Sequence, residues 1–416
     1  MSDKIKIFTI GDHPFSPSGV GNQTRYICEG LLKTGKYEIV SFGGAITHPD
    51  HNPQRTEHWG EDWIIWPIDG YGTQDQVRAM VRQQKPDILW FMTDPRFYGW
   101  LWDIENEIRA QVPMVYYHVW DNYPYPKFNK PFYLSNDHIA CISKLTYDIV
   151  QTVSPEVDSS YIPHAVDEEH FKILPEEQIQ AFRAEKNLGD KFICFWNNRN
   201  ARRKQSGTLV WWFKEFLDLV GHDKAILIMH TDVKDNHGQD LEAIIHELGL
   251  IDGQVLFSRD KIGLPDLAMC YNISDVTINI SDAEGFGLAT LESLSCGTPI
   301  IVNMTGGLQD QITDGEEWFG VGLEPAATSV IGSQQVPYIY EDRVSKEDFM
   351  KGLLKLYNMS REERSEIGRK GAEFVQKNFN FTDFINRWDD LLMDIYENKG
   401  SWEDRKDYKP YSVRTF

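Results

Sequence analysis

The sequence predicts an α/β protein made of two similar halves, and three observations lead to this fold class. Short apolar segments with strand character alternate with helical patterns along most of the chain, which is typical of parallel sheets covered by helices. The length of 416 residues exceeds the ~250–300 at which a single core stops growing. A polar stretch near 165–190 contains no strand before Phe192 and divides the chain. We therefore expect two Rossmann-like domains that face each other across a deep cleft.

The first predicted domain covers residues 1–175. Its strands are expected in five apolar segments, at 4–10, 37–42, 87–92, 113–119 and 138–142. Helical patterns lie between several of these strands, notably at 21–34 and 97–110.

The second predicted domain covers residues 176–381. Its strands are expected at 192–197, 224–230, 254–258, 275–280 and 299–303, and its helices near 206–220, 239–248, 264–272 and 287–296. Residues 323–345 break this alternation and are interpreted as a loop insertion, followed by helices near 346–357 and 361–377. We expect the last helix and the tail, 382–416, to pack back on the first domain.

Composition and charge exclude several classes of protein. The formal net charge of −21 argues against a nonspecific nucleic-acid surface or an anionic membrane partner. The five cysteines are scattered in apolar segments without a CxxC pair, which favours buried free thiols over disulfides or zinc. No segment approaches the ~18–20 apolar residues of a membrane span, and the N-terminus reads as a strand. We expect a cytoplasmic protein.

The segment 281–299, SDAEGFGLATLESLSCGTP, has the chemistry of a nucleotide-sugar site. Gly285 and Gly287 allow a ligand to approach the backbone, and the amides that begin the following helix attract phosphate. Glu284 and Glu292 would repel phosphates but can accept hydrogen bonds from hydroxyl groups on either side of a diphosphate. The alternative is an acid that caps the helix together with a solvent-facing glutamate.

The segment NRNARRKQ follows the predicted strand at 192–197 and places Arg199 five residues before Lys204. Open α/β sheets bind ligands at the carboxyl ends of their strands. Basic side chains at this place can neutralise a diphosphate leaving group without a metal ion. The alternative is a solvated basic loop.

Several motifs in order resemble one family. EGFGLATLESLSCGTPIIVNMTGG resembles the E-x7-E signature of the GT-B retaining glycosyltransferases of family 4 (glycosyl transferases group 1). NRNARRKQ resembles their R-x4-K loop, and IPHAVD (162–167) resembles their interdomain segment. HPFSPSGVGNQTRYICEGLLKTGKYEIVSF resembles their first loop, helix and second strand, so the likeness runs from about residue 5 to about 320.

This resemblance implies a GT-B fold, with an N-terminal acceptor domain and a C-terminal nucleotide-sugar-binding domain. It implies that Arg199 and Lys204 hold the donor pyrophosphate, that Glu284 contacts the transferred sugar, and that Glu292 binds the nucleotide ribose. The remaining implied donor-binding residues are the glycines and neighbours of two loops: Gly19, Gly21, Gly285, Phe286, Gly287 and Leu288. Arg202 and Arg203 add positive charge beyond the minimal pattern.

Three further features keep alternatives open, and a fourth argues against a dinucleotide site. His118 ends the predicted strand at 113–119, and similar enzymes have a histidine in this region that reaches the transferred sugar; the alternative is a structural histidine. Asp94 ends another strand and is a weaker candidate for the acceptor side. The aromatic run at 116–133 is either a stacking platform or a packed loop. GVGNQT lacks the third glycine of a dinucleotide fingerprint, because Thr24 takes its place.

These observations predict an enzyme, a hexosyltransferase-type glycosyltransferase. It would transfer a sugar from a nucleoside diphosphate sugar, expected above all to be a UDP- or GDP-sugar, to an acceptor hydroxyl. The transfer would retain the anomeric configuration and would need neither a metal nor a cofactor. The acceptor is expected to be a glycan or another hydroxyl compound, with a modified DNA base as a further case. The alternatives are a nucleotide-sugar epimerase of GT-B-like fold and a non-catalytic carbohydrate- or DNA-associated binding protein.

Overall fold

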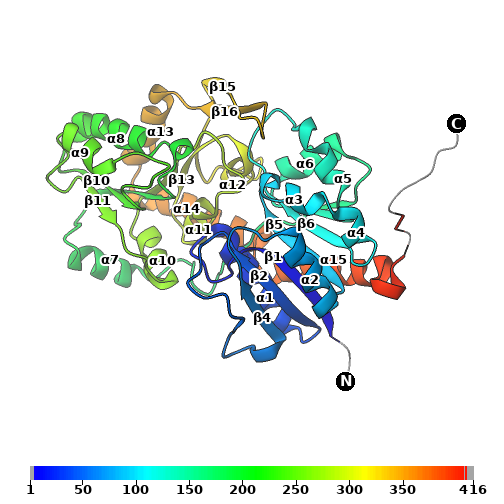
Figure 1. The fold of residues 1–416 in the computed structure, drawn as a ribbon. Coiled ribbons are helices and arrows are strands. Elements are labelled where there is room, and N and C mark those ends of the chain that lie inside the picture. The colour runs from blue at the N-terminus through cyan, green and yellow to red at the C-terminus, as the bar shows by residue number, and fades with distance from the viewer. Residues whose placement is uncertain (1–3, 407, 410–416) are drawn as a thin grey trace.

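The computed structural model describes residues 4–406 and 408–409 and contains two α/β units side by side (Figure 1). The predicted strands are present in order, as are the predicted helices except the one at 97–110, and the α/β class is confirmed. The part of the predicted tail at 407 and 410–416 lies outside the described residues.

The first unit is built on an eight-stranded sheet of order β3-β4-β2-β1-β5-β6-β7-β8. Its strands are β1 (Ile5–Asp12), β2 (Tyr37–Gly44), β3 (Gln54–Arg55), β4 (Trp63–Pro67), β5 (Ile88–Thr93), β6 (Met114–His118), β7 (His138–Cys141) and β8 (Ser159–Tyr161). All neighbouring pairs are parallel except β3 with β4. Strands β3, β4 and β8 were not expected from the sequence; β3 and β8 have only two and three residues.

Helices cover both faces of this sheet. They are α1 (Gly19–Lys33), α2 (Gln74–Gln84), α3 (Gly99–Trp102), α4 (Glu105–Arg109), α5 (Lys130–Leu134) and α6 (Lys144–Val153), with short 3-10 turns η1 (Gly60–Asp62), η2 (Pro95–Phe97) and η3 (Lys127–Asn129). The single helix expected at 97–110 is therefore wrong, because α3 ends at Trp102 and α4 begins at Glu105.

The second unit is built on a six-stranded parallel sheet of order β11-β10-β9-β12-β13-β14. Its strands are β9 (Phe192–Asn197), β10 (Ala225–His230), β11 (Val255–Ser258), β12 (Val276–Asn279), β13 (Ile300–Asn303) and β14 (Gly320–Leu323). Buried apolar residues dominate both sheets, as expected for parallel strands covered on two faces.

The helices of the second unit follow its strands. They are α7 (Glu176–Glu185), α8 (Ser206–Val220), α9 (Leu241–Glu247), α10 (Leu264–Asn272), α11 (Leu288–Ser295), α12 (Gln309–Ile312), α13 (Lys346–Asn358) and α14 (Arg361–Asn378), with 3-10 turns η4 (Arg202–Lys204) and η5 (Gly306–Leu308). The segment expected as a loop at 323–345 instead contains an antiparallel hairpin, β15 (Ala327–Ile331) with β16 (Ile339–Arg343).

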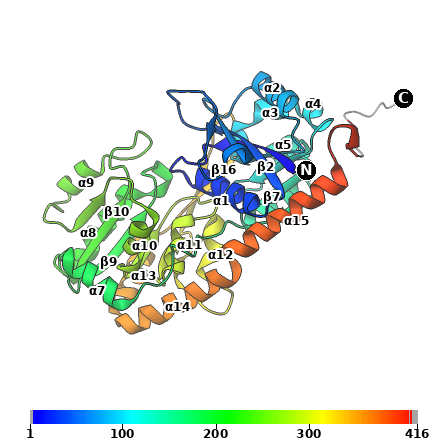
Figure 2. The same cartoon turned by 90° about the horizontal axis from the view of Figure 1, so that it is seen from below.

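The last helix, α15 (Phe381–Lys399), leaves the second unit and lies along the first (Figure 2). Trp388 is fully buried against Trp90 and Tyr117, with ring centroids 5.8 and 4.8 Å away. A Cβ at Gly30 of α1 would lie 2.2 Å from Ile385 Cδ1, so this glycine allows the close approach of α15. The C-terminal helix thus contributes to the core of the N-terminal unit.

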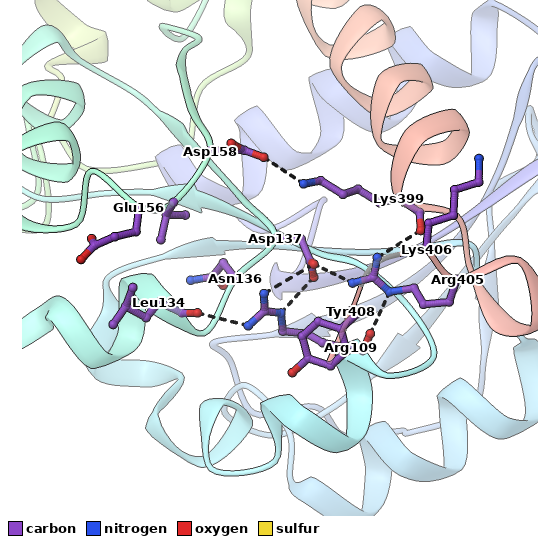
Figure 3. A pocket seen from close by; sticks show the side chains of 11 residues that line it. Arg109, Leu134, Asn136, Asp137, Glu156, Asp158, Lys399, Arg405, Lys406 and Tyr408 are labelled. Carbon is purple, nitrogen blue, oxygen red and sulfur yellow. Dashed lines mark hydrogen bonds and ion pairs between the residues drawn. The ribbon is translucent and has the colours of Figure 1, made fainter. Parts of the chain in front are cut away.

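The segment after α15, which includes η6 (Trp402–Asp404), is also bound to the first unit (Figure 3). Arg405 donates to Asp137 at 2.6 Å, and Arg109 donates to the same carboxylate at 3.0 Å. The Tyr408 ring lies 4.7 Å from the Arg109 guanidinium carbon and 5.2 Å from that of Arg405. These contacts surround a cavity of about 250 Å³, in which Arg109 and Arg405 pair with Asp137 and Lys399 pairs with Asp158.

Candidate active site

A cavity of about 630 Å³ lies between the two units and receives side chains from both. Its N-terminal wall comes from the β1–α1 connection and from residues at or after the ends of four further strands. Apolar side chains and one histidine of this wall are Val20, Met92, Val119, Ile142 and His164. Its C-terminal wall comes from the loops that follow β9, β10, β11 and β12. Both sheets therefore present their carboxyl edges to one cleft, the usual ligand-binding position in open α/β sheets.

Lys204 and Glu284 meet inside this cleft. β9 and β12 are neighbours in the sheet, so the loops that follow them emerge side by side. Lys204 Nζ donates to Glu284 Oε2, and the two side chains are 9% and 12% exposed. Burial raises the pKa of Glu284, but Lys204 and Arg203 outweigh it and hold the pKa below its ordinary value. Glu284 is therefore an ionised acceptor at neutral pH.

The two loops are also joined through their backbones. Asp282 N–H donates to Arg203 C=O at 2.8 Å, and Arg203 Nη1 donates to Ala283 C=O at 2.5 Å. Gln205 Nε2 donates to Asp282 Oδ2 at 2.6 Å. The basic turn and the glutamate loop thus form one rigid unit.

The turn Glu284–Gly287 leads into the N-terminus of α11, and Gly287 is required there. Its φ of +94° lies in the left-handed region, and a Cβ would lie 2.5 Å from Leu308 Cδ2. Gly285 faces the other unit, where a Cβ would lie 3.4 Å from Val119 Cγ1. Phe286 is buried, with its ring 4.9 Å from that of His164. Gly285, Phe286, Gly287 and Leu288 all line the cleft.

Two helix N-termini face each other across the cleft. Gly19 begins α1 and Leu288 begins α11, and a Cβ at Gly19 would lie 3.2 Å from Leu288 Cδ1. Neither helix has an acidic residue in its first turn. Ser18 caps α1 by accepting from Gly21 N–H at 2.9 Å, and Gly21 is tightly enclosed, since a Cβ would lie 2.4 Å from Ser16 Oγ. The positive ends of two helix dipoles therefore point into the same space.

Glu292 lies about one turn inside α11 and also lines the cleft. Tyr271 O–H donates to its Oε2 at 2.7 Å, and Asn197 Nδ2 donates to Tyr271 at 2.8 Å. Burial raises the pKa of Glu292 to about 7, although the Tyr271 hydrogen bond opposes this shift. Its protonation therefore changes near neutral pH.

The three other basic residues of the turn region have different surroundings. Arg199 lies at the rim, 62% exposed, and donates to Asp235 at 2.6 Å, a pair that lowers the pKa of Asp235 to about 2. Arg203 points into the cleft, 3.6 Å from Asp121 Oδ2 of the other unit. Arg202 points to Glu341 of the β15–β16 hairpin. Of the two additional arginines, only Arg203 lines the cleft.

The expectation that His118 reaches into the cleft is wrong for this structure. Its side chain is fully buried, with Nε2 2.9 Å from Tyr133 O–H and Nδ1 3.2 Å from Tyr116 O–H. Burial lowers its pKa to about 3. Side chains alternate along a strand, so His118 points into the core of the first unit whereas the next residue, Val119, lines the cleft.

Asp94 and most of the aromatic run at 116–133 also make contacts within the N-terminal unit and do not line the cleft. Asp94 caps η2 and pairs with Arg96 at 2.8 Å, and it is not among the residues that line the cleft. In the aromatic run, Tyr116, Tyr117 and Tyr133 are buried in the core, while Tyr123 is exposed. Most of this run is thus packed loop and strand.

His164 is one of the cleft residues that were not predicted from the sequence. It is buried, lies in the segment IPHAVD after β8, and its ring contacts Phe286. Tyr117 O–H donates to Ile162 C=O at 2.7 Å and lies 2.8 Å from His164 Nδ1. Because the hydroxyl has one proton, Nδ1 is the donor in this contact and Nε2 is left as an acceptor. Burial lowers the pKa of His164 to about 3, so the ring is neutral.

The cleft is basic in a strongly acidic chain. Five basic and three acidic side chains line it, and the basic ones are Arg25, Arg199, Arg203, Lys204 and Lys261. A cleft with excess positive charge between low-dielectric walls concentrates anionic ligands. Within residues 4–406 and 408–409, no three His, Cys, Asp or Glu side chains form a group that could hold a metal ion.

Two other sequence expectations can be compared with the structure. All five cysteines are free thiols, and four of them are buried while Cys270 is partly exposed. None of the helices in the described part of the chain combines the length and apolar character that a membrane crossing requires.

Known proteins resemble parts of this chain in sequence. Residues 178–374 match the family described as glycosyl transferases group 1. A D-inositol 3-phosphate glycosyltransferase of Paenarthrobacter aurescens is 38% identical over 76 residues, 18% of either chain. A trehalose synthase of Pyrococcus horikoshii is 34% identical over 119 residues, 29% of this chain and 23% of the relative. The chain therefore aligns with about a fifth of the length of these curated relatives.

Solved structures resemble the whole chain in fold. Sucrose-phosphate synthase of Thermosynechococcus elongatus has a TM-score of 0.74 at 17% identity, covering 95% of this chain and 100% of its own. HepE of Anabaena, solved in complex with UDP-glucose, has a TM-score of 0.68 at 13% identity, covering 94% and 99%. At these identities the likeness establishes the fold, which is GT-B as predicted. Residues 178–374 thus match the glycosyl transferases group 1 family, within a chain of GT-B fold.

Proposed function

We propose that this protein is a glycosyltransferase that moves a sugar from a nucleoside diphosphate sugar to an acceptor hydroxyl. The observation that carries this proposal is the meeting, in one basic cleft, of two helix N-termini, the Lys204–Glu284 pair and Glu292. A diphosphate requires positive charge and free amide N–H groups. The sugars on either side of it require groups that accept hydrogen bonds from their hydroxyls. The cleft offers positive charge and helix amides for the diphosphate, and carboxylates for the hydroxyl groups on either side of it.

The donor diphosphate would lie between the N-termini of α1 and α11, beside Lys204 and Arg203. Glu292 would accept hydrogen bonds from the nucleotide ribose, and Glu284 would accept them from the transferred sugar. Arg199 would turn from Asp235 toward the phosphates when the donor binds. The neutral His164 would offer its Nε2 to a sugar hydroxyl.

The chemical step would be stabilised at the leaving group. The bond from the anomeric carbon to the diphosphate breaks, a bond to the acceptor oxygen forms, and the leaving phosphate takes the acceptor proton. Lys204, Arg203 and the helix amides would stabilise the charge that grows on the diphosphate, which makes a metal ion unnecessary in this proposal. We propose retention at the anomeric carbon because the resemblance of the E-x7-E segment to retaining enzymes implies it.

UDP-glucose is the first donor to test, since the similarly folded HepE was solved in complex with it. A hexose is therefore the proposed transferred sugar. The acceptor would enter along the N-terminal wall, whose largely uncharged surface favours a neutral glycan or other hydroxyl compound over a phosphorylated one.

A panel of UDP-, GDP- and ADP-sugars, read by thermal shift and by release of the nucleoside diphosphate, tests the proposal. A donor present at 100 times its dissociation constant should stabilise the protein by about 2.7 kcal/mol. EDTA should leave the release unchanged, and NMR of the product should show the anomeric configuration of the donor. If no donor shifts the melting temperature, the nucleotide-sugar site is wrong. Conversion of the donor to an isomeric nucleotide sugar without acceptor would identify an epimerase instead.

A further inference from the structure

The β15–β16 hairpin lies next to the basic turn of the cleft and also contacts the N-terminal unit. It connects β14 with α13 and pairs from Ala327–Arg343 to Ile331–Ile339. Strand β16 carries three consecutive residues, Tyr340, Glu341 and Asp342, that bond to different parts of the molecule. These three residues link the hairpin to the candidate site.

Glu341 binds the side chain that begins the basic turn. Its carboxylate accepts from Arg202 Nη1 at 3.0 Å and Nη2 at 2.5 Å, a bidentate pair, and lies 3.6 Å from Arg343 Nη2. The Glu341 side chain is 5% exposed. A buried carboxylate with a bidentate arginine has a fixed geometry, because either group alone would leave a charge or a donor unsatisfied.

The orientation of Arg202 determines where the next two basic side chains point. Arg202, Arg203 and Lys204 form the 3-10 turn η4, in which successive side chains diverge by about a third of a revolution. Arg202 points outward to Glu341, Arg203 to Asp121, and Lys204 to Glu284. Glu341 thus fixes the outer side chain of a turn whose two other side chains line the cleft.

Asp342 fixes the adjacent loop. Its N–H donates to Asp282 C=O at 2.8 Å, and the Asp282 N–H donates to Arg203 C=O at 2.8 Å. Asn303 Nδ2 donates to Asp342 C=O at 2.9 Å, and Thr305 donates to its carboxylate at 2.8 Å. The hairpin is therefore bonded to both loops that meet at the Lys204–Glu284 pair.

Tyr340 connects the hairpin to the N-terminal unit. Its N–H donates to Tyr123 C=O, and its C=O accepts from Asn122 Nδ2 at 2.6 Å. Val336, at the hairpin tip, is buried in the core cluster of the N-terminal unit. Asn122 directly follows Asp121, the partner of Arg203, so the same hairpin contacts the loops on both sides of the cleft.

We infer that the hairpin holds the basic turn in its productive position and that Glu341 is a positioning residue for the reaction, acting through Arg202. This inference rests on the proposed glycosyl transfer. In this proposal Glu341 does not contact the substrate. It keeps Arg203 and Lys204 directed at the leaving diphosphate, while Tyr340 ties the hairpin to the N-terminal unit.

Glu341→Gln tests the inference, because the amide keeps the size of the side chain and removes its charge. The matched control is Glu324→Gln, the same change at an exposed position between β14 and β15. We expect Glu341→Gln to lower kcat for nucleoside diphosphate release from UDP-glucose about 10- to 100-fold, with a smaller change in KM, since misplacement affects the transition state most. Glu324→Gln should keep the wild-type rate.

A double-mutant cycle separates positioning from a general loss of structure. Arg202→Gln keeps a side chain that can donate to Glu341, and Arg343 still lies 3.6 Å from that carboxylate, so this variant should fold even if Glu341→Gln does not. If Glu341 acts through Arg202, the two single variants and the double variant should lose similar activity. Additive losses, or a Glu341→Gln variant with the wild-type kcat, would overturn the inference. A wild-type protein that releases no nucleoside diphosphate from any donor would instead overturn the proposed function.

Discussion

The two walls of the cleft differ in chemistry although both are built from the carboxyl ends of parallel strands. Six of the eight charged side chains that line the cleft lie on the C-terminal wall, and only Arg25 and Asp121 lie on the N-terminal wall. The other residues of the N-terminal wall are uncharged, and most of them are apolar. The family match, at 178–374, covers the charged wall and not the other one.

This difference follows from what each wall would bind. A diphosphate has a fixed charge and geometry, so its site needs particular basic groups and amides at particular spacings. An acceptor hydroxyl needs only a surface of suitable shape and access to the anomeric carbon. The charged wall should therefore respond to the loss of single groups, and the neutral wall should respond to changes of shape.

The largest expected effect is that of Lys204→Met, which keeps an unbranched stem and removes the charge beside Glu284. We expect kcat for release of the nucleoside diphosphate to fall about 100- to 1000-fold, the loss typical of one transition-state donor. Lys214→Met on α8, a lysine that pairs with Asp218 and does not line the cleft, is the control and should be near wild type. A Lys204→Met enzyme within threefold of wild type would falsify the leaving-group role.

A second prediction compares two glycines of one turn. Gly287→Ala places a Cβ at a φ of +94° and 2.5 Å from Leu308, and we expect it to lower the free energy of unfolding by about 1–3 kcal/mol. Gly285→Ala meets Val119 and Ile142 of the N-terminal wall only at ordinary contact distances, 3.4 and 3.5 Å, and should keep the wild-type stability. Urea unfolding measures both. Equal losses of unfolding free energy in the two variants would mean that contacts within the C-terminal unit do not hold the turn.

The charged wall was also the part of the site that the sequence could predict. Glu284, Glu292, Arg199 and Lys204 belong to short segments after two strands, and the cleft contains all four because neighbouring parallel strands bring those segments together. The phosphate chemistry is local, so residue type and spacing made these residues candidates, and the resemblance of both segments to one family supplied their expected roles. The roles of these residues stay predictions until donors are tested.

The neutral wall could not be predicted in the same way. His118 and Val119 are adjacent, and only the observed register of β6 decides that the histidine is buried and the valine lines the cleft. His164 enters the cleft through contacts with Tyr117 and Phe286, which are distant in sequence. In the hairpin at 327–343, β15 is mostly exposed and β16 is polar although partly buried, so its pairing gave no apolar alternation to recognise.

A third prediction concerns pH and Glu292. Its pKa of about 7 in the free protein should fall when ribose hydroxyls donate to it, so donor binding should release a proton. The affinity for UDP-glucose should therefore be constant well above pH 7 and weaken as pH falls below it, by at most about tenfold per pH unit. Calorimetry between pH 6 and 8 measures this slope.

Glu292→Gln supplies the control for that experiment, because the amide does not titrate. Its affinity should be weaker at pH 8 and lack the slope attributed to Glu292, while slopes from other groups, such as Asp282 with a pKa raised to about 6 by burial, would remain. An unchanged slope in Glu292→Gln would mean that another group titrates on binding.

The smallest expected effect lies at the rim of the charged wall, where Arg199 pairs with Asp235 instead of pointing into the cleft. Asp235→Asn keeps the shape of the side chain and weakens this hold. An exposed pair contributes about 0.2–1 kcal/mol, so the melting temperature should change little, and donor affinity should rise by no more than about fivefold at low salt. Salt should reduce the gain, since Arg199 is 62% exposed. A donor affinity that falls in Asp235→Asn would show the opposite. Asp235 would then hold Arg199 in its phosphate-binding position, and the charged wall would extend to the rim without any movement of Arg199.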